Sequence, residues 1–244
     1  MKKKSYCLII DSGLGGLHIL AKARKLCPAI NFLYIADDKS LPYGNKSSKE
    51  ITTSILSIYN RFKTCYNITS LVLACNTATA ASINRLREIL TIPIIGTEPN
   101  IKAPTKMHFK KIAILATPLT IKTKRFRNLT NEYTFSIPCN GLAAQIENLN
   151  LYKKKINLTH LINTLRIKQA DCLVLGCTHY SFIASYLKVL NIPIFDSIDG
   201  VAKQIQLTLQ SSAHKNGNTI ILTTSHNTKL TNSYVKYYNK LLCK

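Results

Sequence analysis

Residues 70–77 read Ser-Leu-Val-Leu-Ala-Cys-Asn-Thr, and residues 172–179 read Cys-Leu-Val-Leu-Gly-Cys-Thr-His. Each stretch joins the apolar run Leu-Val-Leu to a small residue, a cysteine and two polar residues. A continuous apolar run is typical of a strand buried on both faces, as in a parallel sheet covered by helices. The likeness indicates two similar α/β units in tandem. The alternative is a chance likeness, because the sequences of buried strands resemble one another.

The rest of the chain alternates short β-branched runs with longer amphipathic segments. This alternation predicts parallel sheets with helices on both faces. The expected strands are Tyr6–Ile10, Asn31–Ala36, Ser70–Ala74, Pro93–Ile95, Lys111–Ala116, Cys172–Gly176, Ile192–Phe195 and Thr219–Leu222. Helices are expected at Ser47–Lys63, Thr79–Leu90, Leu151–Lys168 and Val201–Ser211.

The chain is strongly basic, with 33 Lys and Arg against 11 Asp and Glu in 244 residues, a net charge of +22. A basic surface favours binding to nucleic acid through counterion release. The basic residues are nevertheless spread along the whole chain, beside abundant Asn, Ile and Tyr, as a coding bias would produce. The densest clusters, such as residues 122–127 and 153–155, are short. We therefore expect no nucleic acid as the main partner, although the field attracts small anions.

No segment has the ~18 consecutive apolar residues that a membrane span needs. The first apolar run, Tyr6–Ile10, ends at Asp11 and is too short for the apolar region of a signal peptide. These observations predict a cytoplasmic protein with no membrane partner.

None of the eight cysteines forms a Cys-x-x-Cys pair, so the sequence supports no zinc or thioredoxin-like site. No metal is expected, and a disulfide framework is not expected without a signal peptide. Most of the cysteines are expected to be small buried apolar residues.

Polar residues come after the predicted strands at the carboxyl ends, where open parallel sheets bind their ligands. The segments concerned are residues 11–16, Asp37 with Asp38 and the turn 41–44, residues 75–77, Thr117 with Thr120, and residues 177–179. They predict one binding site that draws on both α/β units.

Cys75 and Cys177 each lie between a predicted strand end and a predicted helix start. Backbone N–H groups at that position stabilise an anion, which lowers the pKa of a thiol and makes it a usable base. The alternative for either cysteine alone is a buried residue that closes a strand. Two thiols in one cleft suit the transfer of a proton from one face of a carbon to the other. Asp11 and His179 are the nearest groups to tune them, the alternative for His179 being a packing role.

The glycine-rich turn after the first strand partly resembles a dinucleotide fingerprint, with Gly13, Gly15 and the later acidic residue Asp37. The third glycine position is His18, and Asp11 places a negative charge where a pyrophosphate would lie. We therefore expect no NAD or FAD, and the glycines are expected to let a small substrate approach the backbone.

Taken together, the motifs resemble those of the cofactor-independent aspartate/glutamate racemase superfamily, and within it the glutamate racemases. They stand in family order and span essentially the whole chain. The motifs are Asp11–Leu17, Pro42–Gly44, Ala74–Ala78, Gly96–Pro99, Leu115–Thr117 with Thr120, and Leu175–Tyr180. The Pro-Tyr-Gly turn and the Gly-x-Glu-Pro segment favour glutamate over aspartate.

The resemblance implies an α/β fold of two pseudo-symmetric domains, each a mostly parallel sheet flanked by helices, with the active site in the cleft between them. Residues 1–97 and 217–244 would form the first domain, and residues 98–216 the second. The implied activity is interconversion of L- and D-glutamate for peptidoglycan precursors, without a cofactor. A homodimer is a possible assembly, since dimers are the commonest oligomers.

The resemblance also implies a role for individual residues. Cys75 would take the proton from D-glutamate and Cys177 from L-glutamate, while Asp11 and His179 assist them. Glu147 matches a further family carboxylate near the second thiol. The substrate ligands would be Asp11, Ser12, Tyr43, Gly44, Asn76, Thr77, Thr117, Thr120, Thr178 and His179.

Three positions depart from the family pattern. Asn140 replaces a proline before Gly141, Ser181 replaces a proline after the Thr-His-Tyr run, and Thr97 replaces a common valine. They leave both thiols in place. Two other functions stay open at this point: an aspartate or broad amino-acid racemase, and a protein of the same scaffold that interacts with DNA or a topoisomerase.

Overall fold

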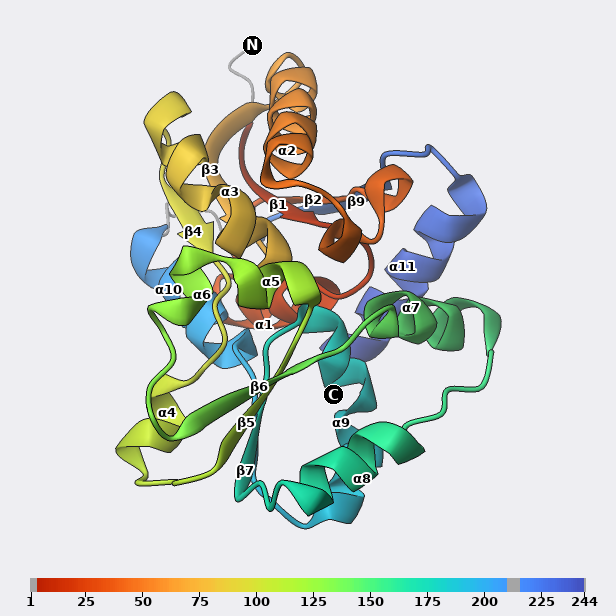
Figure 1. Ribbon diagram of the computed structural model, residues 1–244. Coiled ribbons are helices and arrows are strands. Elements are labelled where there is room, and N and C mark those ends of the chain that lie inside the picture. The colour runs from red at the N-terminus through yellow and green to blue at the C-terminus, as the bar shows by residue number, and fades with distance from the viewer. Residues whose placement is uncertain (1–3, 210–215, 244) are drawn as a thin grey trace.

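The computed structural model in Figure 1 describes residues 4–209 and 216–243. Its first sheet has five parallel strands in the order β4-β3-β1-β2-β9. The strands are β1 (Ser5–Asp11), β2 (Phe32–Ala36), β3 (Asn67–Leu73), β4 (Ile94–Gly96) and β9 (Thr219–Thr223). The central strand β1 is buried along almost its whole length, as its continuous apolar sequence predicts.

The second sheet has four parallel strands in the order β6-β5-β7-β8. The strands are β5 (Ile112–Ala116), β6 (Thr134–Pro138), β7 (Cys172–Leu175) and β8 (Ile194–Phe195). Taken from the other edge, this order repeats β4-β3-β1-β2 of the first sheet, with β7 in the place of β3. The predicted α/β class with two similar units is therefore confirmed, and the likeness between residues 70–77 and 172–179 has a structural basis.

Helices cover both sheets (Figure 1). They are α1 (Leu17–Leu26), α2 (Ser48–Lys63), α3 (Asn76–Ile89), α4 (Lys102–Lys106), α5 (Pro118–Lys122), α6 (Lys124–Arg127), α7 (Leu142–Tyr152), α8 (Thr159–Ile167), α9 (Ala184–Leu187), α10 (Ile198–Thr208) and α11 (Thr228–Leu242). Short 3₁₀ helices lie at Asp38–Ser40, Tyr43–Asn45, Thr178–Ile183 and Lys188–Leu190. Within the described ranges, no helix is both long and apolar enough to cross a membrane.

One expectation about these elements is wrong, and one strand was not expected. The segment 151–168 is not one helix: α7 ends at Tyr152, Lys153 takes a left-handed conformation with φ of 58°, and α8 starts at Thr159. Strand β6 was not predicted, because this edge strand is only half-buried and carries polar residues. The expected helix 201–211 corresponds to α10, which ends at Thr208, and Ser211 lies outside the described residues.

The end of the chain returns to the first sheet. Strand β9 pairs with β2 along the sheet edge, and α11 packs against α1 and β9. Helix α10, which falls within the expected second domain, packs against α1, with Val201, Ala202 and Ile205 in the core of the first unit. The division of the chain at residues 97 and 217 stays a prediction, and this packing favours an earlier return, before Ile198.

Candidate active site

One cleft lies between the two units and contains the thiols of both Cys75 and Cys177. Its walls combine the first unit, through Ser12, Leu41, Pro42, Tyr43, Gly44, Asn45, Cys75 and Thr77, with the second, through Thr117, Pro118, Cys139, Gly141, Ala143, Cys177 and His179. Both cysteines come after equivalent strands, β3 and β7, so the repeat places two thiols at one site.

Cys75 precedes α3, and the N–H groups of Thr77 and Ala78 stabilise its sulfur. Burial nevertheless raises the pKa of the Cys75 thiol well above its ordinary value, and the carboxyl of Asp11 and the thiol of Cys177 raise it further. The predicted lowering of the pKa is therefore wrong for Cys75. The desolvation of a fully buried thiol exceeds the effect of the helix start, so in this structure Cys75 carries its proton at neutral pH.

Cys177 differs from Cys75 in the element that begins after it. A 3₁₀ helix, not an α-helix, begins at Thr178, so the expected helix start is replaced by a tighter turn. This turn brings Nδ1 of His179 to 4.0 Å from the Cys177 sulfur. The Cys177 sulfur thus contacts a side chain two residues away, and no α-helix begins beside it.

His179 connects Cys177 to Glu147. Its Nε2 lies 2.8 Å from Oε2 of Glu147, and both side chains are buried. Burial lowers the pKa of His179, but the contacts with Cys177 and Glu147 outweigh that effect and hold the pKa well above its usual value. His179 is therefore an imidazolium at neutral pH, with one N–H directed to the carboxylate and the other available to the sulfur.

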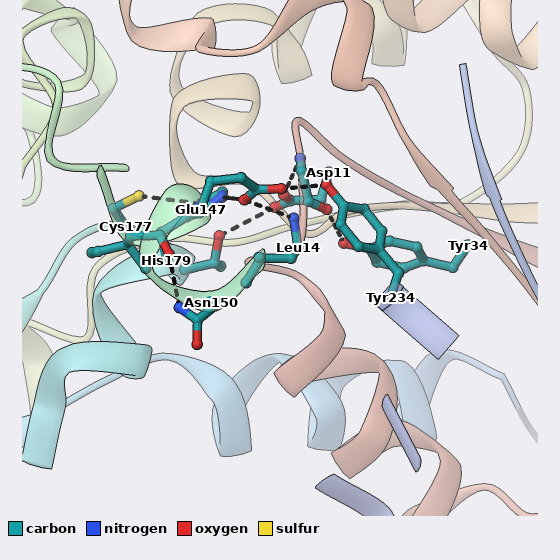
Figure 2. Close-up of polar contacts among 11 residues, drawn as sticks. Asp11, Leu14, Tyr34, Glu147, Asn150, Cys177, His179 and Tyr234 are labelled. Atoms are coloured by element: carbon teal, nitrogen blue, oxygen red, sulfur yellow. Dashed lines mark hydrogen bonds and ion pairs between the residues drawn. The ribbon is translucent and has the colours of Figure 1, made fainter. Parts of the chain in front are cut away.

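Glu147, on α7 of the second unit, is held by two groups of the first unit (Figure 2). The backbone N–H of Leu14 donates to Oε2 over 3.2 Å, and the hydroxyl of Tyr234 on α11 donates to Oε1. Sequence reasoning did not find Tyr234, since no motif surrounds it. It did place Glu147 near the second thiol, and the structure brings the two together through His179.

Asp11 ends β1, and its carboxylate faces both units. Gly13 donates its backbone N–H to Oδ1 over 2.7 Å, and the hydroxyl of Thr178 donates to Oδ2 over 3.1 Å. Burial raises the pKa of Asp11 to about 6, while His179 and the Gly13 N–H lower it in part. Asp11 is therefore largely ionised at neutral pH and lies close enough to Cys75 to raise the pKa of that thiol.

The glycines after β1 lie close to side chains of the second unit. A Cβ on Gly13 would lie 2.8 Å from Oε2 of Glu147, and a Cβ on Gly15 would lie 2.6 Å from Nδ1 of His179. The close approach that these glycines permit in the structure is that of side chains from the other unit. Their expected role in letting a substrate approach the backbone stays a prediction. The turn is therefore part of the contact between the units.

Three threonine hydroxyls meet across the cleft. Oγ1 of Thr117 lies 3.0 Å from Oγ1 of Thr77 and 2.9 Å from Oγ1 of Thr120, which in turn donates to Thr77 over 3.2 Å. Gly44 packs against Thr117, at a distance that leaves little room for a side chain. The predicted ligands Thr77, Thr117, Thr120 and Gly44 are thus brought together.

Other expected ligands are placed less directly. Tyr43 lines the cleft and donates to Oδ2 of Asp37 over 2.8 Å. Asn76 is buried, does not line the cleft, and its amide makes no hydrogen bond in this structure. Cys139, which sequence reasoning took for an ordinary buried residue, lines the cleft, and burial raises the pKa of its thiol to about 12.

The three departures from the family pattern lie outside the cleft lining. Thr97 is buried, with its hydroxyl donating to the Leu73 carbonyl over 2.8 Å. Asn140 is exposed, before Gly141, whose φ of 66° suits a residue without a Cβ. Ser181 lies in the 3₁₀ helix after Cys177. None of the three displaces a thiol.

Across the described parts of the chain, no three His, Cys, Asp or Glu side chains are placed to hold a metal ion together. The polar side chains of the cleft carry thiols, hydroxyls, an amide and an imidazolium. Such a set suits proton transfer at a small polar substrate.

Comparison with known proteins identifies the family. The Asp/Glu/Hydantoin racemase family matches residues 16–205. A glutamate racemase of Clostridium acetobutylicum is 37% identical in an alignment 213 residues long that covers 82% of either chain. The chain belongs to this family, among the glutamate racemases. A glutamate racemase of Leptospira interrogans is 35% identical in an alignment 218 residues long that covers 86% of this chain and 85% of that one.

A solved glutamate racemase has the same fold. Isoform RacE1 of Bacillus anthracis superimposes with a TM-score of 0.80 at 27% identity, over 100% of this chain and 96% of that chain. The family assignment and the shared fold account for the motif order found in the sequence.

Proposed function

We propose that this glutamate racemase homologue interconverts L- and D-glutamate by proton transfer at Cα between two thiols. One observation carries the proposal: Cys75 and Cys177 come after equivalent strands of the two units and line the same cleft. A single base would return the proton to the face it left. Two opposed thiols allow removal on one face and delivery on the other.

In the direction from L- to D-glutamate, the thiolate of Cys177 takes the Cα proton, and the electron pair of the C–H bond passes into the carbanion. The thiol of Cys75 then protonates the opposite face. The raised pKa of Cys75 suits this direction, because its proton is in place before the substrate reacts. At the end Cys177 is the thiol and Cys75 the thiolate, which is the starting state for the reverse reaction.

Neighbouring charged groups influence the protonation of each thiol. The imidazolium of His179, paired with Glu147, offers a positive charge and a proton donor beside the Cys177 thiolate. Asp11 lies beside Cys75 and opposes its ionisation. The proposed ligands of the substrate are Ser12, Tyr43, Gly44, Asn76, Thr77, Thr117, Thr120 and Thr178, of which Ser12, Tyr43, Gly44, Thr77 and Thr117 line the cleft.

The proposed setting is the cytoplasm, where D-glutamate is a building block for peptidoglycan precursors. The reaction requires no added cofactor, because the chain itself supplies the acid and the base. A homodimer stays a proposal.

The decisive experiment incubates purified, reduced protein with L-glutamate in D₂O and no added cofactor. Loss of the Cα–H signal by NMR is followed together with the optical rotation. We expect exchange and racemisation, and the loss of racemisation in both C75A and C177A. C65A, which changes an exposed cysteine outside the cleft, serves as control.

Turnover of L-aspartate at a comparable rate would be consistent with the two-thiol mechanism but would contradict glutamate as the specific substrate. No exchange with either amino acid, from folded protein, would overturn the proposed function. Salt-sensitive nucleic-acid binding that survives the loss of both thiols would then become the leading explanation of the basic charge.

A further inference from the structure

Tyr234 is a fully buried residue of α11 that reaches the active site from the end of the first sheet. Its hydroxyl donates to Oε1 of Glu147 (Figure 2). The opposite oxygen, Oε2, accepts from His179 and from the Leu14 N–H. The two oxygens of one carboxylate thus have separate partners, and only Oε2 faces the chain of contacts that leads to Cys177.

The hydrogen bond from Tyr234 determines how this carboxylate is oriented. The last torsion of a glutamate side chain is broad, so the residue itself sets no preferred plane for its two oxygens. A donor fixed on Oε1 sets that plane and directs Oε2 toward His179. Burial and the charge of Glu147 both raise the pKa of the Tyr234 phenol, which therefore keeps the proton it donates.

We infer that Tyr234 is a positioning residue for the proton transfer at Cys177: it holds the Glu147 carboxylate in the orientation that binds His179. The inference rests on the proposed racemisation and extends it to a residue outside the motifs. Tyr234 does not line the cleft, so it acts through Glu147 and His179 rather than on the substrate.

Loss of the Tyr234 hydroxyl should affect the proton step at Cys177 and not the step at Cys75. Cys177 has His179 4.0 Å away and Glu147 beyond it, whereas the charged neighbour of Cys75 is Asp11. Loss of the Tyr234 hydroxyl leaves Oε1 buried without its donor and weakens the hold on the imidazolium. The proton step at Cys177 slows, and the step at Cys75 does not.

The test is Y234F, which removes one oxygen atom and keeps the ring. Because the two enantiomers have equal free energy, kcat/KM must fall equally in both directions, and we expect a loss of about tenfold, the order of one hydrogen bond to a charged group. Primary deuterium isotope effects separate the two steps. The effect on kcat/KM should rise for L-glutamate deuterated at Cα and fall for the D-enantiomer, because the Cys177 step becomes more rate-limiting.

Y238F is the matched control. Tyr238 lies on the same helix, is buried in the same core, and bonds through its hydroxyl to Thr219 instead of Glu147. It should keep the isotope effects of the wild type in both directions. A purely structural role of Tyr234 would make Y234F resemble Y238F, and that result would overturn the inference.

A double-mutant cycle with E147Q covers the case in which Y234F folds poorly. The neutral amide lowers the cost of an unpaired oxygen at position 147, so the double variant is the safer protein. If Tyr234 acts through Glu147, Y234F/E147Q has the same kcat/KM as E147Q alone. Additive losses would overturn the inference, whereas an inactive wild type would overturn the proposed function itself.

Discussion

Thr178, the residue after the second unit's cysteine, donates a 3.1 Å hydrogen bond to Oδ2 of Asp11, at the end of the first unit's central strand. Asp11 has no exposed surface, and its other oxygen accepts from Gly13. A carboxylate is thereby buried at the junction of the two units. Its ionisation affects stability as well as chemistry.

Replacing Asp11 by Asn should stabilise the fold at high pH. Burial raises the pKa of Asp11 from its ordinary 3.8 to about 6 in the folded protein. The stability that the protonated carboxyl contributes is therefore complete below pH 3.8 and is lost as the pH rises through 6. Above pH 6 the ionised form costs about 3 kcal/mol.

We expect D11N to have a higher free energy of unfolding than the wild type at pH 8, and the difference to shrink toward pH 4. Urea denaturation at pH 4, 6 and 8 measures it. A difference that does not change with pH would contradict the raised pKa.

Replacing Gly15 by Ala should damage the contact between the units. The new methyl group would lie 2.6 Å from both Nδ1 of His179 and Oγ1 of Thr178, so His179 must move. We expect a loss of stability of about 1–3 kcal/mol and a fall in kcat/KM. Thermal unfolding and racemisation assays measure the two effects.

G200A is the control for Gly15. Gly200 lies in α10 with open space where a Cβ would be, so alanine there should add about 0.5–1 kcal/mol of stability. Activity should stay unchanged. If G15A kept the stability and activity of G200A, the close approach of His179 to Gly15 would not matter for function.

Replacing Thr117 by Val should weaken substrate binding. Thr117 bonds to Thr77 and Thr120 and also caps α5, so its loss costs about 1 kcal/mol of stability. We expect KM for glutamate to rise, because Thr117 lines the cleft. T123V removes the corresponding cap of α6 outside the cleft and should cost similar stability with an unchanged KM. Equal KM values for both variants would contradict the role of Thr117.

Alkylation should separate the cysteines by exposure. Cys65 and Cys243 are exposed, whereas Cys75 is buried and burial raises the pKa of its thiol. Since the thiolate is the reactive form, iodoacetamide at pH 7.5 should label the exposed pair at least about tenfold faster than Cys75. Mass spectrometry of peptides over time gives the rates. Early labelling of Cys75 would show that its thiol is ionised in solution.

Those parts of the fold that depend on continuous apolar runs could be predicted from the sequence. Strand β7 (Cys172–Leu175) and the second half of β3, residues 70–73, are buried throughout and carry the continuous apolar runs that interior strands of parallel sheets favour. The start of β3 was not predicted, because Asn67 and Thr69 are polar and exposed. The edge strand Thr134–Pro138 was not predicted, because it is only partly buried and its sequence includes polar residues. The helix break at Lys153 was not predicted, because the spacing of apolar residues does not reveal that a lysine adopts a left-handed backbone conformation.

The site could be predicted as far as its residues are close in sequence to a strand end. Cys75, Cys177 and Asp11 each lie at a strand end. Ligands of parallel sheets bind at the carboxyl ends of the strands, so these residues could be assigned to the site. Tyr234 lies in the middle of a helix, and its position near the site depends on how α11 packs against the first unit. The pKa of Cys75 was missed for a similar reason: desolvation depends on what the other unit covers, which no local pattern records.

The return of β9 and α11 to the first sheet has a consequence for biosynthesis. The ribosome completes Cys75, Cys177, Glu147 and His179 before it adds Tyr234. A nascent chain can therefore hold both thiols of the cleft while the Glu147 carboxylate still lacks its phenol donor. Strand β2 likewise has no partner on that side until β9 has been synthesised. Since Tyr234 is proposed to position Glu147, we expect full activity only after α11 has packed against α1 and β9.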